Sequence, residues 1–151
     1  MIGRAILLCL LTSLAACSSD DGDPRGPAIP NAEGRFDGQW TFRFGGDESS
    51  DLHCAGYVSI TSQSGTSITG EMHTFDDAVC SDGSSPIAGT ISAAGEVELA
   101  VPDIEGDMTA EGCSGDAALS GSLAGDSLSL ALGPVHCPDQ PSAELLFAGT
   151  R

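Results

Sequence analysis

Apolar and polar residues alternate with a period of two along most of the chain after residue 36. Trp40, Phe42 and Phe44 fall on one face of such a segment, with Thr41 and Arg43 between them. This alternation is typical of antiparallel strands that bury one face. The pattern predicts short strands at 38–44, 54–61, 67–74, 86–91, 96–101, 107–112, 117–123, 127–132 and 144–150. No segment shows a clear helical stripe.

Three glycine-containing segments lie between alternating runs and predict tight hairpins. They cover residues 63–66, 93–95 and 124–126. Glycine takes the positive φ that such turns require. Consecutive short strands joined by hairpins predict an all-β domain over 36–151, a small antiparallel up-and-down barrel of about eight strands. A β-sandwich is the alternative.

A weak repeat, apolar-x-Gly-x-apolar, recurs in three predicted strands and centres on Gly70, Gly89 and Gly121. Glycine at mid-strand permits the sharp coiling that closes a small barrel, which is the interpretation we favour. The alternative is that it leaves space for a ligand inside. The candidate ligand-binding residues would then be Trp40, Ile68, Gly70, Ile87, Gly89, Leu119, Gly121 and Leu128.

The first 16 residues predict a secretory signal peptide. Arg4 supplies a basic start, a short apolar run follows, and small residues precede Cys17. Leu14-Ala15-Ala16-Cys17 resembles the lipobox of bacterial lipoproteins, in which the cysteine is acylated and the signal is cut before it. The resemblance implies a lipid anchor at Cys17 and, because Ser18 rather than aspartate follows, a place at the outer membrane. Residues 17–35, rich in Pro, Gly and acids, predict a flexible tether.

Acidic residues dominate the charge: 22 Asp and Glu stand against 5 Lys and Arg, for a formal net charge of −17. Such a surface repels nucleic acid and anionic lipid headgroups, which excludes both as expected partners. Divalent cations and basic proteins are compatible with it. A purely solubilising role is the simplest interpretation.

Four cysteines remain after Cys9 in the predicted signal and Cys17 at the predicted anchor. In an exported domain they predict two disulfides, with three possible pairings. We favour Cys54–Cys80 and Cys113–Cys137, because each joins near neighbours in the sequence.

Metal binding has two candidate sets. Asp103, Glu105 and Asp107 alternate around a glycine and could converge on Ca²⁺. His53 and His136 lie beside cysteines and could form a zinc site, although an oxidising compartment favours disulfides. Solvated surface carboxylates are the commoner explanation of the first set, so no cofactor is expected.

No motif indicates catalysis. The sequence contains neither a Gly-x-Ser-x-Gly elbow nor His-Glu-x-x-His nor a phosphate-binding glycine loop. The prediction is therefore a non-enzymatic binding module, with a small apolar molecule as the favoured ligand because aromatic residues make up only 5% of the chain.

Two families of small barrels are similar to this chain. Gly38-Gln39-Trp40 and Arg151 resemble the Gly-x-Trp motif and late arginine of lipocalin-like (calycin) barrels, which implies that Arg151 packs over Trp40. An early tryptophan strand, a Cys54–Cys80 disulfide and a flexible N-terminal segment resemble periplasmic inhibitors of secreted metalloproteases. That second resemblance implies the alternative function, a protein-interaction role as a protease inhibitor or an envelope structural component.

Overall fold

The computed structural model describes residues 27–78 and 80–151 of the 151-residue chain. The predicted signal peptide, the lipobox, Cys9, Cys17 and the first part of the predicted tether lie outside the described residues. Within the described part of the chain, no helix is long and apolar enough to cross a bilayer.

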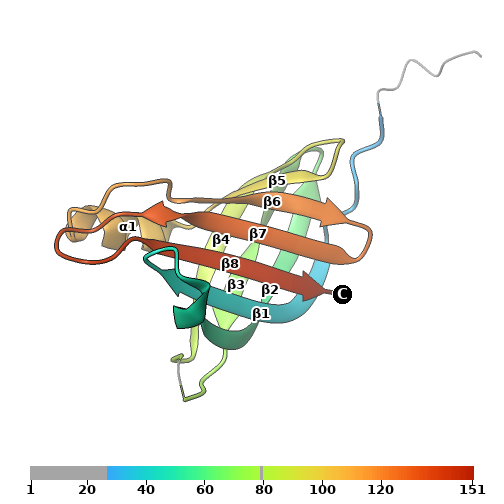
Figure 1. Ribbon diagram of the computed structural model, residues 1–151. Helices are drawn as coiled ribbons and strands as arrows, with labels where there is room; N and C mark the ends of the chain where they lie inside the picture. Colours follow the sequence, from blue (N-terminus) through green and yellow to red (C-terminus); the bar gives the residue numbers. More distant parts are fainter. Residues whose placement is uncertain (1–26, 79) are drawn as a thin grey trace, which may run out of the picture.

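Eight antiparallel strands form a closed barrel in sequence order, and the last strand pairs with the first (Figure 1). The predicted up-and-down barrel is therefore confirmed. The strands are β1 (Gly34–Phe44), β2 (Leu52–Ser64), β3 (Ser67–Thr74), β4 (Gly83–Ile91), β5 (Glu96–Ala100), β6 (Ala118–Ala124), β7 (Ser127–Val135) and β8 (Ala143–Thr150). A short 3-10 helix, η1 (Glu48–Ser50), and one α-helix, α1 (Pro102–Ala110), complete the elements.

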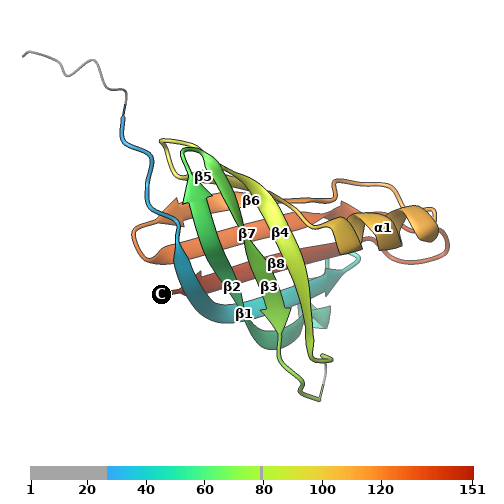
Figure 2. The ribbon, with the colours of Figure 1, turned by 180° about the vertical axis from the view of Figure 1, so that it is seen from behind.

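Because consecutive strands run in opposite directions, the connections alternate between the two ends of the barrel. The hairpins after β2, β4 and β6 share one end with the start of β1 and the end of β8, and we call this the hairpin end. The connections after β1, β3, β5 and β7 share the other end, which we call the loop end. Figure 2 shows the same arrangement from behind, with α1 far from the C-terminus.

The three predicted glycine turns are present at the hairpin end. Gly65, Gly95 and Gly125 take φ values of 59°, 82° and 61°, in the region that favours glycine. Each turn joins its two strands through only a few residues, so the strand ends are held close together.

An N-terminal strap, residues 27–33, covers the hairpin end. Ala32 is 2% exposed, and its backbone N–H donates to Gln63 Oε1 at 2.7 Å. Arg151 donates to the carbonyls of Glu33 at 2.8 Å and Asn31 at 3.2 Å. Residues 27–35, which the sequence assigns to the predicted tether, thus form the strap and the first residues of β1.

The prediction for the connection after β5 is wrong. The segment 107–112, expected to be a strand, lies in α1 and the turn that follows it. Ile104 and Met108, four residues apart, both pack against the barrel core. Pro102 in the first turn and Asp103 and Glu105 beside the helix N-terminus are start signals that a search for alternation passes over.

Candidate functional site: the mouth at the loop end

The barrel interior is packed with side chains. Trp40 is fully buried, its ring lies 4.6 Å from that of Phe147, and its indole N–H donates to the His73 carbonyl at 2.9 Å. The predicted ligand-lining residues Ile68, Ile87, Leu119 and Leu128 are each at most 3% exposed and belong to this core. Burial of each such aliphatic side chain contributes about 1.5–3 kcal/mol to stability. These residues hold the barrel together.

The mid-strand glycines belong to the backbone packing of the barrel. A Cβ on Gly70 would overlap the carbonyl oxygen of Ser59, and one on Gly121 would overlap that of Ser129. A Cβ on Gly89 would likewise overlap the carbonyl oxygen of Glu98. The close approach of adjacent strands requires glycine here, which agrees with the coiling interpretation.

The loop end, in contrast, holds an apolar hollow of ≈ 310 Å³ lined by Phe42, Phe44, Leu52, Thr74, Cys80 and Ser81. A second hollow of ≈ 260 Å³ shares Phe42 and Thr74 with it and extends to Met72, Ile104 and Leu145. We call the two together the mouth hollow. Phe44 is 39% exposed and Leu52 is 42% exposed, so part of the lining faces solvent.

Strand geometry explains why these residues meet. Phe42 and Phe44 continue the inward face of β1 that begins with Phe36 and Trp40, and Leu52 pairs with Phe42 across the sheet. At the middle of the barrel this face meets the opposite wall. Near the loop end the side chains extend beyond the packed layer, and Phe44 and Leu52 stay partly exposed among the described residues.

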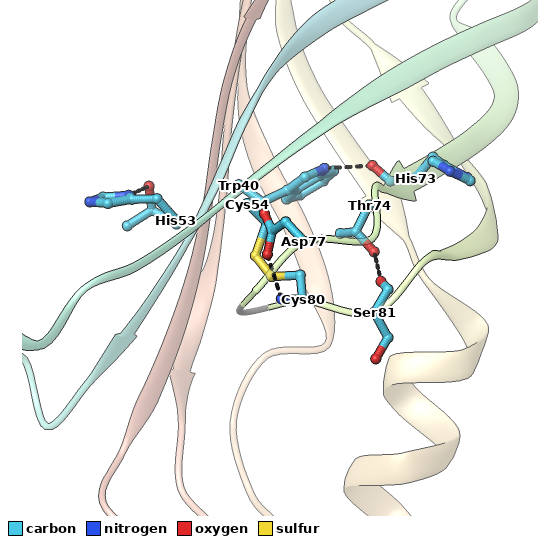
Figure 3. Close-up of a disulfide and its surroundings, with 9 residues drawn as sticks. Trp40, His53, Cys54, His73, Thr74, Asp77, Cys80 and Ser81 are labelled. Atoms are coloured by element: carbon cyan, nitrogen blue, oxygen red, sulfur yellow. Dashed lines mark hydrogen bonds between the residues drawn. A yellow bond between two sulfur atoms is a disulfide. The ribbon is translucent and has the colours of Figure 1, made fainter.

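The Cys54–Cys80 disulfide fixes one side of the mouth (Figure 3). It joins β2 to the connection after β3, and Asp77 Oδ1 accepts a hydrogen bond of 2.8 Å from the Cys80 backbone N–H. The Thr74 hydroxyl donates to the Ser81 carbonyl at 2.9 Å, which holds the two ends of this connection together. The second disulfide, Cys113–Cys137, also lies at the loop end, so both favoured pairings are confirmed.

An ion-pair network braces another side of the mouth. Arg43 donates two hydrogen bonds of 2.9 Å to Asp51, and Glu48 and Glu144 lie at 3.6 and 4.0 Å from the guanidinium. The hydrogen bonds from Arg43 hold the pKa of Asp51 below its ordinary value, although partial desolvation opposes the shift. The same bonds raise the pKa of Arg43. The network fixes the position of the chain at Asp51, immediately before β2 begins at Leu52.

A cross-strand stack lies on the outer face of β1–β3. Arg35 sits 3.9 Å above the Tyr57 ring, Tyr57 stacks on His73 at 4.9 Å, and Phe75 meets His73 edge-on. The Tyr57 hydroxyl donates to Glu71 at 2.8 Å, and this bond is the first cause of the raised pKa of Tyr57. Since these groups satisfy one another, the stack stabilises the β1–β3 sheet.

Another concavity, of ≈ 590 Å³, lies over β4–β6. Its lining includes Thr90, Ser92, Glu96, Glu98 and Ser120, which are small or acidic and lack aromatic rings. Ile91 and Val97 also line it, but both are at most 4% exposed, so the concavity presents no half-exposed apolar side chain comparable to Phe44 or Leu52. The mouth hollow is therefore the better candidate site.

The candidate metal ligands whose side chains the structure describes are not brought together as expected; the side chain of Asp107 lies outside that description. Asp103 and Glu105 are exposed on α1, where residues two apart point to different sides of the helix, so the turn assumed for calcium is absent. His53 contacts Thr41 at 3.0 Å on the barrel surface. Glu111 approaches the sulfurs of Cys113 and Cys137, but these form a disulfide and offer no thiolate for zinc.

The position of Arg151 differs from the one implied by the calycin resemblance. Its guanidinium lies 5.1 Å from the Phe36 ring rather than over Trp40, and it also donates to Asp126 at 3.1 Å. Trp40 lies deeper in the barrel, where Phe147 and the His73 carbonyl are its partners. The arginine nevertheless closes one end of the barrel, by binding the strap.

Comparison with protein-family models, with curated proteins and with solved structures finds no match to this chain. The fold is therefore described by its architecture, a closed eight-stranded antiparallel barrel.

Proposed function

We propose that this chain is an exported, lipid-anchored binding module without catalytic activity, and that it takes a small apolar group into the mouth hollow. The observation that carries the proposal is the position of Phe44 and Leu52. Both line the hollow and both are more than a third exposed, whereas the rest of the barrel interior is filled.

The size of the hollow supports a small ligand. Small-molecule sites commonly have volumes from about 300 Å³ upward and a mostly apolar lining with a few polar groups. The ≈ 310 Å³ hollow combines two phenylalanines and a leucine with the side chains of Thr74 and Ser81. The lipid anchor at Cys17 and the bacterial outer membrane remain part of the proposal on the strength of the lipobox resemblance.

The fold narrows the alternative, a protein-interaction role, to one surface of the barrel. An inhibitor that inserts its N-terminal segment into a protease cleft needs that segment to be free, and residues 29–33 are instead hydrogen-bonded and packed on the hairpin end. A protein partner would therefore meet Phe44 and Leu52 at the loop end. Ligand binding explains the concave shape of that surface better.

The test is titration of the oxidised mature chain, carrying Cys17→Ser so that no detergent is needed, with the fluorescent apolar probe N-phenyl-1-naphthylamine. We expect saturable binding with a blue shift. Phe44→Ser and Leu52→Ser should each weaken it at least tenfold, because they remove apolar lining. Phe75→Ser is the matched control: Phe75 is similarly exposed at 37% but does not line the ≈ 310 Å³ hollow. Absence of saturable binding, or equal loss in all three variants, would contradict the proposal.

A further inference from the structure

A cluster of potential metal ligands lies at the loop end, outside the lining of the mouth hollow. The carboxylate of Glu111 and the sulfurs of Cys113 and Cys137 lie within 4.8 Å of one another. All three come from the connections after β5 and β7, and they do not line either part of the mouth hollow. The disulfide between the two cysteines leaves no thiolate for a metal, so the cluster is closed in the oxidised chain.

The backbone places the two cysteines opposite each other by means other than the disulfide. Ser114 and His136 form an isolated antiparallel bridge and exchange two backbone hydrogen bonds of 2.7 Å. Cys113 precedes Ser114 and Cys137 follows His136, so the cysteines form the neighbouring pair of this bridge. In antiparallel chains, side chains of the pair next to a hydrogen-bonded pair approach most closely. The Cα atoms of Cys113 and Cys137 are accordingly 4.1 Å apart.

The end of α1 brings Glu111 to the same place. Gly112 takes a φ of 71°, and the backbone N–H groups of Gly112 and Cys113 donate to the carbonyls of Thr109 at 3.3 Å and Met108 at 2.8 Å. This pattern is a Schellman motif, which ends a helix and turns the chain back. Because Met108 also packs against the barrel core, the turn is fixed to the barrel. Glu111 Oε2 lies 4.0 Å from Cys113 Sγ, and the Glu111 side chain is exposed to ions in solvent.

The surroundings and the donor types favour a thiophilic cation. Residues 44–150 contain no Lys or Arg, so that part of the chain offers Glu111 no fixed positive partner. Arg43 is held by Asp51, and Arg151 binds the strap at the hairpin end. Thiolate and carboxylate donors together suit Zn²⁺ and related divalent cations, which take four ligands in a tetrahedral arrangement. Two sulfurs and one carboxylate would leave the fourth position to water.

We propose that Glu111, Cys113 and Cys137 form a redox-gated site for a thiophilic divalent cation such as Zn²⁺. A dithiol reductant opens the disulfide: it gives up two electrons and two protons, becomes a disulfide itself, and leaves two thiols on the chain. The cation then binds both sulfurs and the carboxylate, and the two thiol protons pass to solvent. A disulfide oxidant takes the two electrons back, restores the Cys113–Cys137 bond and releases the cation. This site is independent of the mouth hollow and goes beyond the proposed function.

The test uses the mature chain with Cys17→Ser, reduced with a phosphine and titrated with Cd²⁺, a thiophilic stand-in for Zn²⁺ whose bonds to thiolate sulfur absorb in the ultraviolet. We expect one Cd²⁺ per reduced chain, displaced by Zn²⁺, and no binding by the oxidised chain. Affinity should rise with pH, because both thiols must lose a proton. Near-ultraviolet circular dichroism of Trp40, the only tryptophan, checks that the reduced barrel stays folded.

Matched cysteine variants identify the thiols. Cys113→Ser should abolish the Cd²⁺ absorption, because a single thiolate remains at the site. Cys80→Ser makes the same change at a partly buried cysteine of the other disulfide and should keep the absorption. The reverse result would place the metal at the Cys54–Cys80 pair and overturn the proposal.

Matched carboxylate variants identify the third ligand. Glu111→Gln should weaken Cd²⁺ binding about tenfold, because an amide oxygen is a poor substitute for a carboxylate. Glu105→Gln removes the same charge from an exposed position on α1 and should change the affinity less than about twofold. His136→Ala should also have little effect, since adjacent residues of an extended segment point to opposite faces and Cys137 faces the cluster.

Several outcomes would overturn the proposal. A reduced, folded chain that binds no Cd²⁺, or that binds it equally well as Glu111→Gln, lacks the assigned site. Equal Cd²⁺ affinity of the reduced chain in urea would show that any two thiols of a flexible chain suffice. Loss of the Trp40 signal on reduction would mean that the thiols have no fixed geometry without the disulfides. None of these results changes the probe titration of the oxidised chain, which tests the proposed function separately.

Discussion

The two ends of this barrel are built in opposite ways. At the hairpin end, three glycine turns keep the strands close, and the strap is pinned by hydrogen bonds from Gln63 and Arg151. At the loop end, longer connections, two disulfides and an Arg43-centred network surround an apolar hollow. Figure 1 shows the start of β1 and the C-terminus at the hairpin end and α1 at the other.

Under the proposed function, the two ends of the barrel would separate attachment from recognition. Backbone hydrogen bonds are sufficient where the connections are short, whereas longer connections lose more conformational entropy on folding and need covalent links. If the chain is anchored through Cys17, the strap leads toward the membrane from the hairpin end. The mouth then lies at the end of the barrel away from the attachment point.

Removal of a disulfide should have the largest effect on this contrast. Each bridge closes a loop, with sequence separations of 26 and 24, and its loss should cost about 3 kcal/mol. Urea denaturation of Cys54→Ala/Cys80→Ala and of Cys113→Ala/Cys137→Ala measures the cost. Only the loss of the Cys54–Cys80 disulfide should also weaken probe binding, because Cys80 lines the hollow. Hydrogen exchange then checks whether the two ends are independent. If either variant lost as much amide protection at the hairpin end as at the loop end, the ends would not be independent.

Arg151→Ala should have a smaller effect, confined to the hairpin end. The side chain donates to the carbonyls of Asn31, Glu33 and Gly125 and lies over Phe36, so its loss should cost about 1–2 kcal/mol. Hydrogen exchange should show faster exchange at the Ala32 amide, with probe affinity unchanged. Arg151→Lys is the control for charge: a single ammonium cannot reach all of these acceptors, so it should recover only part of the stability. Weakened probe binding in Arg151→Ala would show that the ends are coupled.

The smallest expected effect is a change in pH dependence at the loop end. The pKa of Asp51 is lowered in the folded protein by hydrogen bonds from Arg43. A carboxyl with a lowered folded pKa contributes stability above its unfolded pKa of about 3.9, and that contribution is lost as the pH falls through the folded value. The stability difference between the native chain and Asp51→Asn should therefore be present at pH 7 and shrink below pH 4. Thermal unfolding measured from pH 7 to pH 2 checks this.

Glu98→Gln is the control for the acid series, because Glu98 is exposed on β5. The stability difference between Glu98→Gln and the native chain should not shrink below pH 4 in the way expected for Asp51→Asn. An Asp51→Asn curve parallel to that of the native chain at all pH values would show that the Arg43–Asp51 pair adds nothing to the stability of the mouth.

Alternation was sufficient to predict most of the barrel because each strand buries one face. The three glycine turns and the favoured disulfides are found where they were expected. The prediction failed at 107–112 because α1 uses a different period: Ile104 and Met108 reach the core from the same side of a helix. These two residues carry the only long apolar side chains of α1, so its helical period is weak in the sequence.

The candidate site was harder to predict from the same pattern. Trp40, Phe42 and Phe44 share one face of β1 and look alike in the sequence. In the barrel, Trp40 meets Phe147 and is buried, whereas Phe44 lies beyond the last opposing side chain and is exposed. Position along the barrel axis, which the local pattern does not encode, separates a core residue from a lining residue.

The sequence by itself determined the period-two strands, the hairpin turns and the acidic surface, because each depends on neighbouring residues and their intrinsic preferences. Only the tertiary structure decided that the interior is filled, that Arg151 binds the strap and covers Phe36, and that Phe42, Phe44 and Leu52 form a mouth. The physical reason is that closure of the sheet sets which side chains face one another across the barrel. Those contacts join residues that are far apart along the chain.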